Sequence, residues 1–379
     1  MLGVNLKRWL WMLLALALAS CQLSACTSYL IADRKDSGLM LDMARYFYTP
    51  EAVKGFIDTV AAEGGTFVHL HFSDNENYAL ESRLLGQKAA DAQRRSDGVY
   101  VNKTTGKPFW SDGQLREVVN HARSKKIELV PEIGSPGHMG GIFHLMENAY
   151  GKETVKQMQT ANGELDISKP KNTDFMQALI AETADKFGTV SRHFHIGGDE
   201  FGYDTESNRN FVAYANRQAE FLARRGLETR IWNDGIIKPT MDALNRDIEI
   251  TYWSYDGDPQ DKAEAAKRRT VRATLPDLLD HGFKVLNYNS YYLYVVPRDG
   301  KNWQADSAYA ASDARKNWHL GVWDGNNHRN ALTDGRERKI SGAAVAVWGE
   351  HAGTLSNGQM QEYARGLLST VLAKTNGRE

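Results

Sequence analysis

Short apolar runs of β-type composition alternate with amphipathic helical patterns from Gly38 to the end of the sequence. Eight runs are expected as strands: Leu39–Ala44, Phe67–Phe72, Ile127–Ile133, His193–Gly197, Thr229–Asn233, Glu249–Ser254, Lys284–Asn289 and Gly342–Trp348. The expected helices are Pro50–Glu63, Gln114–Lys125, Thr173–Phe187, Asn210–Arg225, Leu275–His281, Ala305–Trp318 and Gln359–Lys374, with a weaker one at Pro239–Asn245. This order predicts an α/β fold, a single (β/α)8 TIM barrel. An open doubly wound sheet would need fewer strands and usually a glycine-rich phosphate loop, which we do not find.

The first residues of the chain do not fit this pattern. Lys7 and Arg8 precede the apolar run Trp9–Ala19, which is too short to span a bilayer, and small residues follow it. This order is typical of a signal peptide. The run ends in Leu-Ala-Ser-Cys21, which resembles a bacterial lipobox, where the cysteine is lipidated and becomes the mature N-terminus. A weaker copy ends at Cys26, and ordinary signal-peptide cleavage nearby is the alternative.

These observations predict a signal peptide of lipoprotein type at residues 1–21, a tether at 22–37 and a barrel at 38–379. The protein is then exported, either lipid-anchored in the cell envelope at the outer membrane or secreted to the extracellular space. Both cysteines lie before the barrel, which excludes an internal disulfide and a cysteine-based metal site there.

The charge and the aromatic content bear on the choice of ligand. A formal net charge of -1 gives no argument for nucleic acid or an anionic membrane surface as a partner. The nine Trp and sixteen Tyr include several clusters near Asp and Glu, as in sites that stack sugar rings and bind their hydroxyl groups. Large aromatic side chains also fill large cores, so composition alone does not decide between these roles.

Polar and aromatic residues follow every expected strand, where a TIM barrel carries its active site. They are Arg45, His71 and Asp74, Glu132 and His138, Asp199 and Glu200, Trp232 and Asp234, Trp253 and Asp256, Tyr291–Tyr294, and Trp348 and Glu350. Most strand ends need only a turn, so their recurrence after all eight strands indicates one shared site.

The segment His193–Glu200 reads His-Phe-His-Ile-Gly-Gly-Asp-Glu and is the most specific motif. The two glycines let the backbone turn and leave room for a ligand. Adjacent side chains cannot point the same way, so Asp199 and Glu200 should do different jobs. A bare Asp-Glu pair is also common at a helix N-terminus, but here the pair ends a barrel strand.

This octet resembles the signature of the family-20 glycoside hydrolases, the β-N-acetylhexosaminidases. The resemblance covers nearly all of the chain after Gly38, and is carried by Gly38–Arg45, His69–Asp74, His195–Tyr203, Ile250–Asp258, Asn287–Tyr294 and Trp348–Glu350. The same stretches resemble a family member that degrades the biofilm polysaccharide poly-β-1,6-N-acetylglucosamine. The resemblance implies that polymer, or a related β-linked N-acetylglucosamine saccharide, as the binding partner, with no cofactor and no metal.

The family's mechanism fits two adjacent carboxylates, which cannot straddle a sugar ring as the pair of an ordinary retaining glycosidase does. The resemblance implies that the substrate's acetamido oxygen attacks the anomeric carbon, with retention of configuration. Glu200 would protonate the leaving oxygen and then activate water, while Asp199 would hold the acetamido N–H. An acid that later acts as a base works best with a pKa raised toward neutral, which we expect for Glu200.

The resemblance also assigns the remaining site residues. It implies that Tyr294 bonds the acetamido oxygen and that Arg45 and Glu350 hold sugar hydroxyls, which an Arg donor and a Glu acceptor suit. His138 would lie near the acid. The acetyl pocket and further binding positions would be Trp232, Trp253, Trp348, Tyr203 and Asp258. A structural salt bridge for Arg45 and core packing for the tryptophans are the alternatives.

One position departs from the family pattern. The family usually has an Asp two residues before the Pro of its Pro-x-His segment, where a carboxylate helps to orient the His. Gly134 stands there in this sequence. We therefore expect His138 to lack that carboxylate partner, with an effect on the tuning of Glu200.

Three other functions remain as alternatives. His69 and His71 lie on one face of a strand and can bind a metal, as in a metal-dependent hydrolase or deacetylase. A hydrogen-bonded pair inside the barrel is the other interpretation. A non-catalytic carbohydrate-binding protein is a second alternative, although both Asp199 and Glu200 are present. A hexosaminidase for chitin oligosaccharides or glycan termini would share the chemistry and differ in pocket shape.

Overall fold

The computed structural model describes residues 35–203, 205–257, 261–300, 302–325 and 330–378. The predicted signal peptide, its Cys21 and nearly all of the tether lie outside the described residues, as does Asp258. Within the described ranges, no helix combines the length and apolar character needed to cross a membrane.

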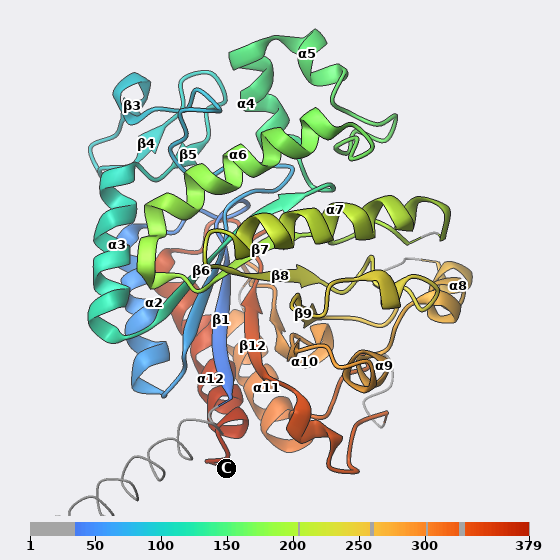
Figure 1. Cartoon of the computed structure of the whole chain (residues 1–379). Helices are drawn as coiled ribbons and strands as arrows, with labels where there is room; N and C mark the ends of the chain where they lie inside the picture. The colour runs from blue at the N-terminus through green and yellow to red at the C-terminus, as the bar shows by residue number, and fades with distance from the viewer. Residues whose placement is uncertain (1–34, 204, 258–260, 301, 326–329, 379) are drawn as a thin grey trace, which may run out of the picture. The chain divides into compact units, whose positions relative to one another are not determined.

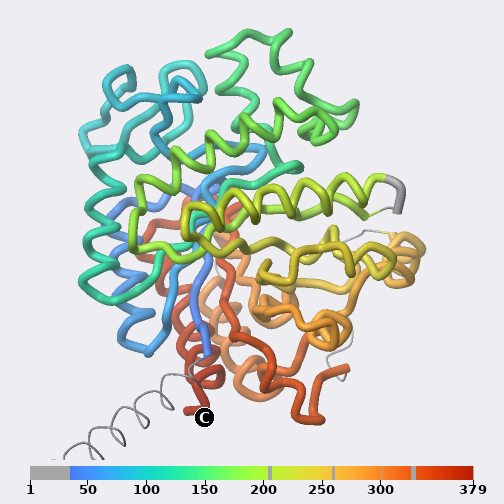
Figure 2. The backbone as a smooth tube through the Cα atoms, in the orientation of Figure 1, coloured from blue at the N-terminus to red at the C-terminus, as the bar shows by residue number. Residues whose placement is uncertain are grey.

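Parallel strands form the centre of the fold and close into the predicted (β/α)8 TIM barrel, which is confirmed (Figure 1). Each strand pairs with the next, and the first pairs with the last. Figure 2 shows this closure as the blue and red segments that run side by side. The strands are β1 (Asp36–Asp42), β2 (Phe67–His71), β6 (Glu128–Ser135), β7 (His193–Gly197), β8 (Glu228–Trp232), β9 (Glu249–Tyr252), β10 (Val285–Asn287) and β12 (Gly342–Val347), with β11 (Tyr294–Val295) added to β12.

The strand β1 begins at Asp36, two residues before the predicted start of the barrel at 38. Asp36 pairs with Gly342 and Ser37 with Ala343, so both belong to the barrel. The predicted boundary at 37 is wrong because these polar residues interrupt the apolar pattern, while their backbone groups still pair with β12.

Helices surround the barrel at the seven well-marked predicted positions (Figure 1). They are α2 (Pro50–Ala62), α3 (Asp112–Lys125), α6 (Pro170–Phe187), α7 (Thr205–Ala223), α9 (Leu275–Asp280), α11 (Trp303–Asn317) and α12 (Asn357–Thr375). The helix expected at Pro239–Asn245 is replaced by a short 3-10 turn at Met241–Ala243, so that prediction is wrong. The segment spans only about two turns, and so short a helix is not stable without support from tertiary packing.

Several elements have no counterpart in the predicted pattern. A small antiparallel sheet of β3 (Gln93–Arg94), β4 (Tyr100–Val101) and β5 (Pro108–Phe109) lies between β2 and α3 in the chain. The helices α4 (Gly140–Tyr150) and α5 (Lys152–Lys156) follow β6, α8 (Lys262–Val271) precedes α9, and α10 (Ser290–Leu293) follows β10. In Figure 1 the small sheet and α4 lie at the same end of the barrel.

The barrel has an outer core against the helices and a smaller core inside. Leu39 and Leu41 of β1 belong to the outer core, whereas Met40 belongs to the inner one, as alternation along a strand requires. Small side chains at Ala344 and Ala346 of β12 leave volume for large ones opposite. The inner core also includes Phe67, Val130, Trp232, Trp253, Leu286 and Tyr288. The floor beneath the site is therefore packed, which fixes the position of the aromatic residues above it.

Candidate active site

The turn after β7 sets the directions of the two adjacent carboxylates. Gly197 and Gly198 have φ values of 81° and 89°, which residues other than glycine rarely adopt. A Cβ atom on Gly197 would lie 2.6 Å from the Cα atom of Gly134, so the close approach of β6 and β7 also requires glycine. Glu200 itself has φ 53°. Strained backbone of this kind at a non-glycine residue is concentrated at functional sites.

A pocket of about 550 Å³ opens above these residues, within the usual size range of small-ligand sites. Nine of the eleven predicted catalytic and binding residues line it: Arg45, His138, Asp199, Glu200, Trp232, Trp253, Tyr294, Trp348 and Glu350. Ser254, Gly257, Ser290, Tyr291, Val296 and Gly325 complete the lining. Residues from seven strand ends, far apart in the sequence, thus meet at one place.

Aromatic rings form one wall of the pocket. Tyr294 stacks on Trp253 with ring centroids 5.9 Å apart and an interplanar angle of 8°, and it lies 5.4 Å from Trp348. The indole N–H groups of two pocket tryptophans, Trp253 and Trp232, donate to buried carboxylates. Trp253 Nε1 donates to Asp234 Oδ2 at 2.6 Å. The result is a rigid apolar surface of a kind that suits a methyl group.

The carboxylate of Glu132 holds the third tryptophan. Trp232 Nε1 donates to Glu132 Oε1 at 2.8 Å. Glu132 Oε2 lies 2.6 Å from His71 Nδ1 and 2.9 Å from His69 Nε2, and Oε1 lies 3.2 Å from His195 Nδ1. All four partners are buried. The predicted pair His69 and His71 thus belongs to a polar cluster inside the barrel.

This cluster bears on the metal alternative. One ligand atom from each of His69, Glu132 and His195 lies within 4.8 Å of the others, a spacing that could hold a metal ion. None of the three lines the pocket. Glu132 already forms hydrogen bonds with His71 Nδ1 and Trp232 Nε1, and burial lowers the pKa of His69 to about 4. The cluster is therefore better described as support for Trp232 than as the place of reaction.

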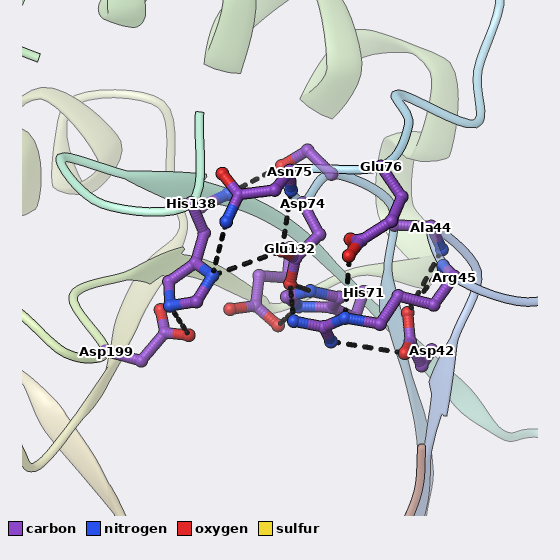
Figure 3. Close-up of polar contacts among 12 residues, drawn as sticks. Asp42, Ala44, Arg45, His71, Asp74, Asn75, Glu76, Glu132, His138 and Asp199 are labelled. Carbon is purple, nitrogen blue, oxygen red and sulfur yellow. Dashed lines mark hydrogen bonds and ion pairs between the residues drawn. The ribbon is translucent and has the colours of Figure 1, made fainter. Parts of the chain in front are cut away.

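A chain of contacts between charged groups runs from Arg45 through Asp74 and His138 to Asp199 (Figure 3). Arg45 Nη2 contacts Asp74 Oδ2 at 2.6 Å, and His71 Nε2 contacts the same oxygen at 3.0 Å. The other oxygen of Asp74 lies 3.1 Å from His138 Nδ1. His138 Nε2 in turn lies 3.1 Å from Glu200 Oε2 and 3.6 Å from Asp199 Oδ2. One imidazole therefore faces both carboxylates of the pair.

His138 has a carboxylate partner, although position 134 supplies none, as expected from Gly134. The partner is Asp74, in the loop after β2, and not a residue of the segment around Gly134. A Cβ atom at position 134 would meet nothing nearer than Ser73 at 3.8 Å. Spacing within one segment could not reveal this, because the carboxylate arrives from the neighbouring strand.

The electrostatics of the three groups differ from expectation. The charge of Asp199 raises the pKa of His138 to about 12, so the imidazole is a cation. Burial raises the pKa of Asp199 to about 6. The hydrogen bond from His138 lowers the pKa of Glu200, which is also 52% exposed. The expected upward shift for Glu200 is therefore wrong, because the imidazolium at 3.1 Å favours its charged form.

Of the two remaining predicted positions, the structure describes Tyr203 but not Asp258. Tyr203 lies beneath two guanidinium groups, with Arg268 4.2 Å and Arg272 5.2 Å from its ring centroid, and it does not line the pocket. Asp258 lies outside the described residues. Conversely, Asp74 and Asp234 position site residues although neither was assigned a role there. Their place just after β2 and β8 was the only sequence signal for either.

Comparison with known proteins adds independent findings. Residues 37–368 match the family model described as glycosyl hydrolase family 20, catalytic domain. A crystal structure of Dispersin B is 52% identical over 90% of this chain and 100% of its own, with a TM-score of 0.88. A lacto-N-biosidase from Bifidobacterium bifidum is 26% identical over 63% of this chain, and a β-N-acetylhexosaminidase from Cellulomonas fimi 26% over 61%. The matches span 21% and 45% of these two relatives, which are much longer proteins.

Proposed function

Because the chain belongs to glycosyl hydrolase family 20, we propose that it is a retaining β-N-acetylhexosaminidase that hydrolyses β-1,6-linked poly-N-acetylglucosamine. The observation that carries the activity is the adjacent pair Asp199 and Glu200 beside a rigid aromatic wall in one pocket. We propose this polymer as the substrate because the sequence motifs of the chain resemble those of an enzyme that degrades it. The 52% identity between the chain and Dispersin B supports the same choice.

The substrate's own acetamido group supplies the nucleophile in this proposal. The acidic residues that line the pocket, among those described, are Asp199, Glu200 and Glu350. Other nearby carboxylates are ion-paired, Asp234 with Arg272 and Asp256 with Arg269. The acetamido oxygen attacks the anomeric carbon while the sugar's acetyl methyl group packs against the tryptophans. Asp199 accepts the acetamido N–H and stabilises the positive charge that develops on that group.

The acid step requires a proton on Glu200 and a charge on Asp199. The pKa directions favour the opposite arrangement, with the proton on Asp199. The two forms hold the same number of protons, so the pair titrates as a unit. An acetamido N–H at Asp199 stabilises the charged form of Asp199 and thereby moves the proton to Glu200. The reacting sugar would thus produce the acid that cleaves its own glycosidic bond.

His138 strengthens that acid. Its imidazolium stabilises the carboxylate that Glu200 becomes after the proton has moved to the leaving oxygen. The same carboxylate then takes a proton from water, which attacks the intermediate from the face that the leaving group has vacated. Two displacements at one carbon retain the configuration.

Arg45 and Glu350 are proposed to hold the hydroxyl groups of the reacting sugar. Arg45 is tied to Asp42, Asp74 and Glu76, so its guanidinium is held in place without a ligand. Glu350 follows β12 and is exposed at the pocket. A donor and an acceptor on one pocket suit two neighbouring hydroxyl groups.

Product analysis tests the substrate. β-1,6- and β-1,4-linked N-acetylglucosamine oligomers of equal length are digested side by side, and we expect faster cleavage of the β-1,6 series, with the β-anomer formed first. Faster cleavage of the β-1,4 series would move the assignment to chitin oligosaccharides or glycan termini. Release of the α-anomer, or efficient cleavage of a β-glucoside that lacks the acetamido group, would contradict substrate assistance.

We also propose that the protein is exported and anchored by a lipid on Cys21, as the lipobox-like sequence indicates. The native protein should then partition with membranes. Replacement of Cys21 by Ser should release it or block its maturation, whereas a lipid-free mature N-terminus beyond Cys26 would contradict the anchor.

A further inference from the structure

Exposed tyrosines lie on α10, at the pocket, and on α11, which contacts α10. Within the described ranges, three large hydrophobic side chains are exposed: Tyr150 at 45%, Tyr291 at 57% and Tyr309 at 69%. Single exposed aromatics are common on protein surfaces and need no explanation. Two of these three, however, flank the same buried side chain, Tyr292, and one of them lines the active-site pocket.

The local structure holds Tyr291 in place at the rim. Asn289 caps α10, and its side-chain oxygen accepts from the backbone N–H groups of Tyr291 and Tyr292 at 3.1 Å each. The ring of Tyr291 packs edge-on against Tyr292, with centroids 4.8 Å apart. Tyr292 is only 5% exposed. A ring that is fixed on one side and open on the other loses little conformational entropy when a ligand covers it.

The aromatic surface of the pocket continues outward through these residues. Trp253 at 8% exposure and the half-buried Tyr294 line the pocket, and Tyr291 follows at the rim. The helix α10 packs against α11, which carries Tyr309 (Figure 1). Tyr309 lies near enough to Tyr292 to contribute, with Tyr291, to the raised pKa of its phenol. Exposure thus increases from the wall of the pocket to Tyr291 and then to Tyr309.

From this continuity we infer that Tyr291 and Tyr309 form a stacking path for the sugar units of a β-linked N-acetylglucosamine chain beyond the cleaved bond. The inference rests on the proposed function and extends it from the reacting sugar to the polymer. The apolar faces of the sugar rings would cover the tyrosine rings, and the hydroxyl groups would stay in water. Two isolated rings offer far less than the roughly 800 Å² that each partner buries in a stable dimer, so a second copy of the chain fits the surface poorly.

The length of the oligosaccharide substrate distinguishes binding along this path from binding in the catalytic pocket. The test compares Tyr309→Ala, Tyr291→Ala and the control Tyr150→Ala, whose side chain is also exposed but lies on α4. Each is assayed on an aryl β-N-acetylglucosaminide, which has one sugar, and on β-1,6-linked oligomers of two to eight units. A parallel β-1,4 series keeps the test valid if that linkage is preferred.

We expect Tyr309→Ala to leave kcat/KM for the aryl substrate unchanged and to raise KM about 3- to 10-fold for the longest oligomers, which is the effect of one aromatic contact. Tyr291→Ala should raise KM at shorter lengths than Tyr309→Ala does, and Tyr150→Ala should have no effect at any length. Equal losses at all lengths, or no loss with the longest oligomers, would overturn the path. Failure of the wild-type enzyme on every N-acetylglucosaminide would instead overturn the proposed function, and binding of the octamers to the variants by calorimetry would still test the path.

Discussion

Replacement of His138 by Gln should move the pH profile of the enzyme to higher pH. The productive form of the pair Asp199 and Glu200 carries one proton. It is therefore populated between the lowered pKa of Glu200 and the pKa of Asp199, which is about 6. The kcat/KM of the wild-type enzyme should fall above about pH 6, because kcat/KM reports the ionisations of the free enzyme. The imidazolium favours both carboxylates, so its removal raises both pKa values.

The size of the shift follows from the distances. His138 Nε2 lies 3.1 Å from Glu200 Oε2 and 3.6 Å from Asp199 Oδ2. Two unit charges about 4 Å apart interact by about 4 kcal/mol at an effective dielectric constant of about 20, which corresponds to about three pKa units. Water around the half-exposed Glu200 reduces this, so a shift of about one to three units is expected. The alkaline limb should move from about pH 6 to between about pH 7 and 9.

The assay is the hydrolysis of an aryl β-N-acetylglucosaminide from pH 3.5 to 9.5, with kcat/KM measured at each pH. The matched control is His121→Gln, which removes a 2.9 Å contact between His121 Nε2 on α3 and Asp58 Oδ1 on α2 and should leave the profile unchanged. A profile of His138→Gln that keeps its limbs, or moves to lower pH, would refute the assignment of His138 as the cation shared by the pair.

Three further substitutions test other parts of the site. Glu200→Gln should lower kcat by about 10²–10⁴-fold. The unfolding transition should stay unchanged because the side chain is half exposed, and near wild-type turnover would contradict the role of Glu200 as the acid. Gly197→Ala should destabilise the fold by about 1–3 kcal/mol in chemical denaturation, because φ is 81° and the new Cβ atom would lie 2.6 Å from the Cα atom of Gly134. Gly134→Ala should be tolerated, and equal losses in the two variants would contradict this steric explanation. Asp234→Asn should cost about 3–5 kcal/mol, because it leaves Arg272 buried without its counter-charge, and a loss below about 1 kcal/mol would show that other groups satisfy this guanidinium.

Much of the barrel could be predicted from the sequence because its strands are short apolar runs with clear ends. His193–Gly197 was placed to the residue, and Phe67–Phe72 differs from β2 by one residue. The boundary at Asp36 was missed because backbone pairing at the barrel seam tolerates polar side chains. The short sheet β3–β5 was missed because two-residue strands carry no periodicity.

The residues of the site were easier to identify than their electrostatics. Strand-end position and family motifs were enough to place Asp199, Glu200 and seven others around one pocket. The partner of His138 was not predictable, because the contact with Asp74 joins two strands and depends on side-chain direction. The pKa of Glu200 depends on that same contact, so its direction could not be known before the distance to the imidazole was.

The pairing of β1 with β12 imposes an order on the assembly of the enzyme. All other neighbouring strands of the barrel follow one another in the sequence. The pair β1 and β12, in contrast, joins residues about 300 positions apart. Contacts so distant in sequence carry a large loop-closure cost and tend to form late in folding. Arg45 and Glu350 stand at the two sides of the seam. A partly folded chain can therefore present Asp199 and Glu200 together. Arg45 and Glu350 come together to bind the sugar hydroxyls only when the last strand docks. Substrate binding thus depends on completion of the fold.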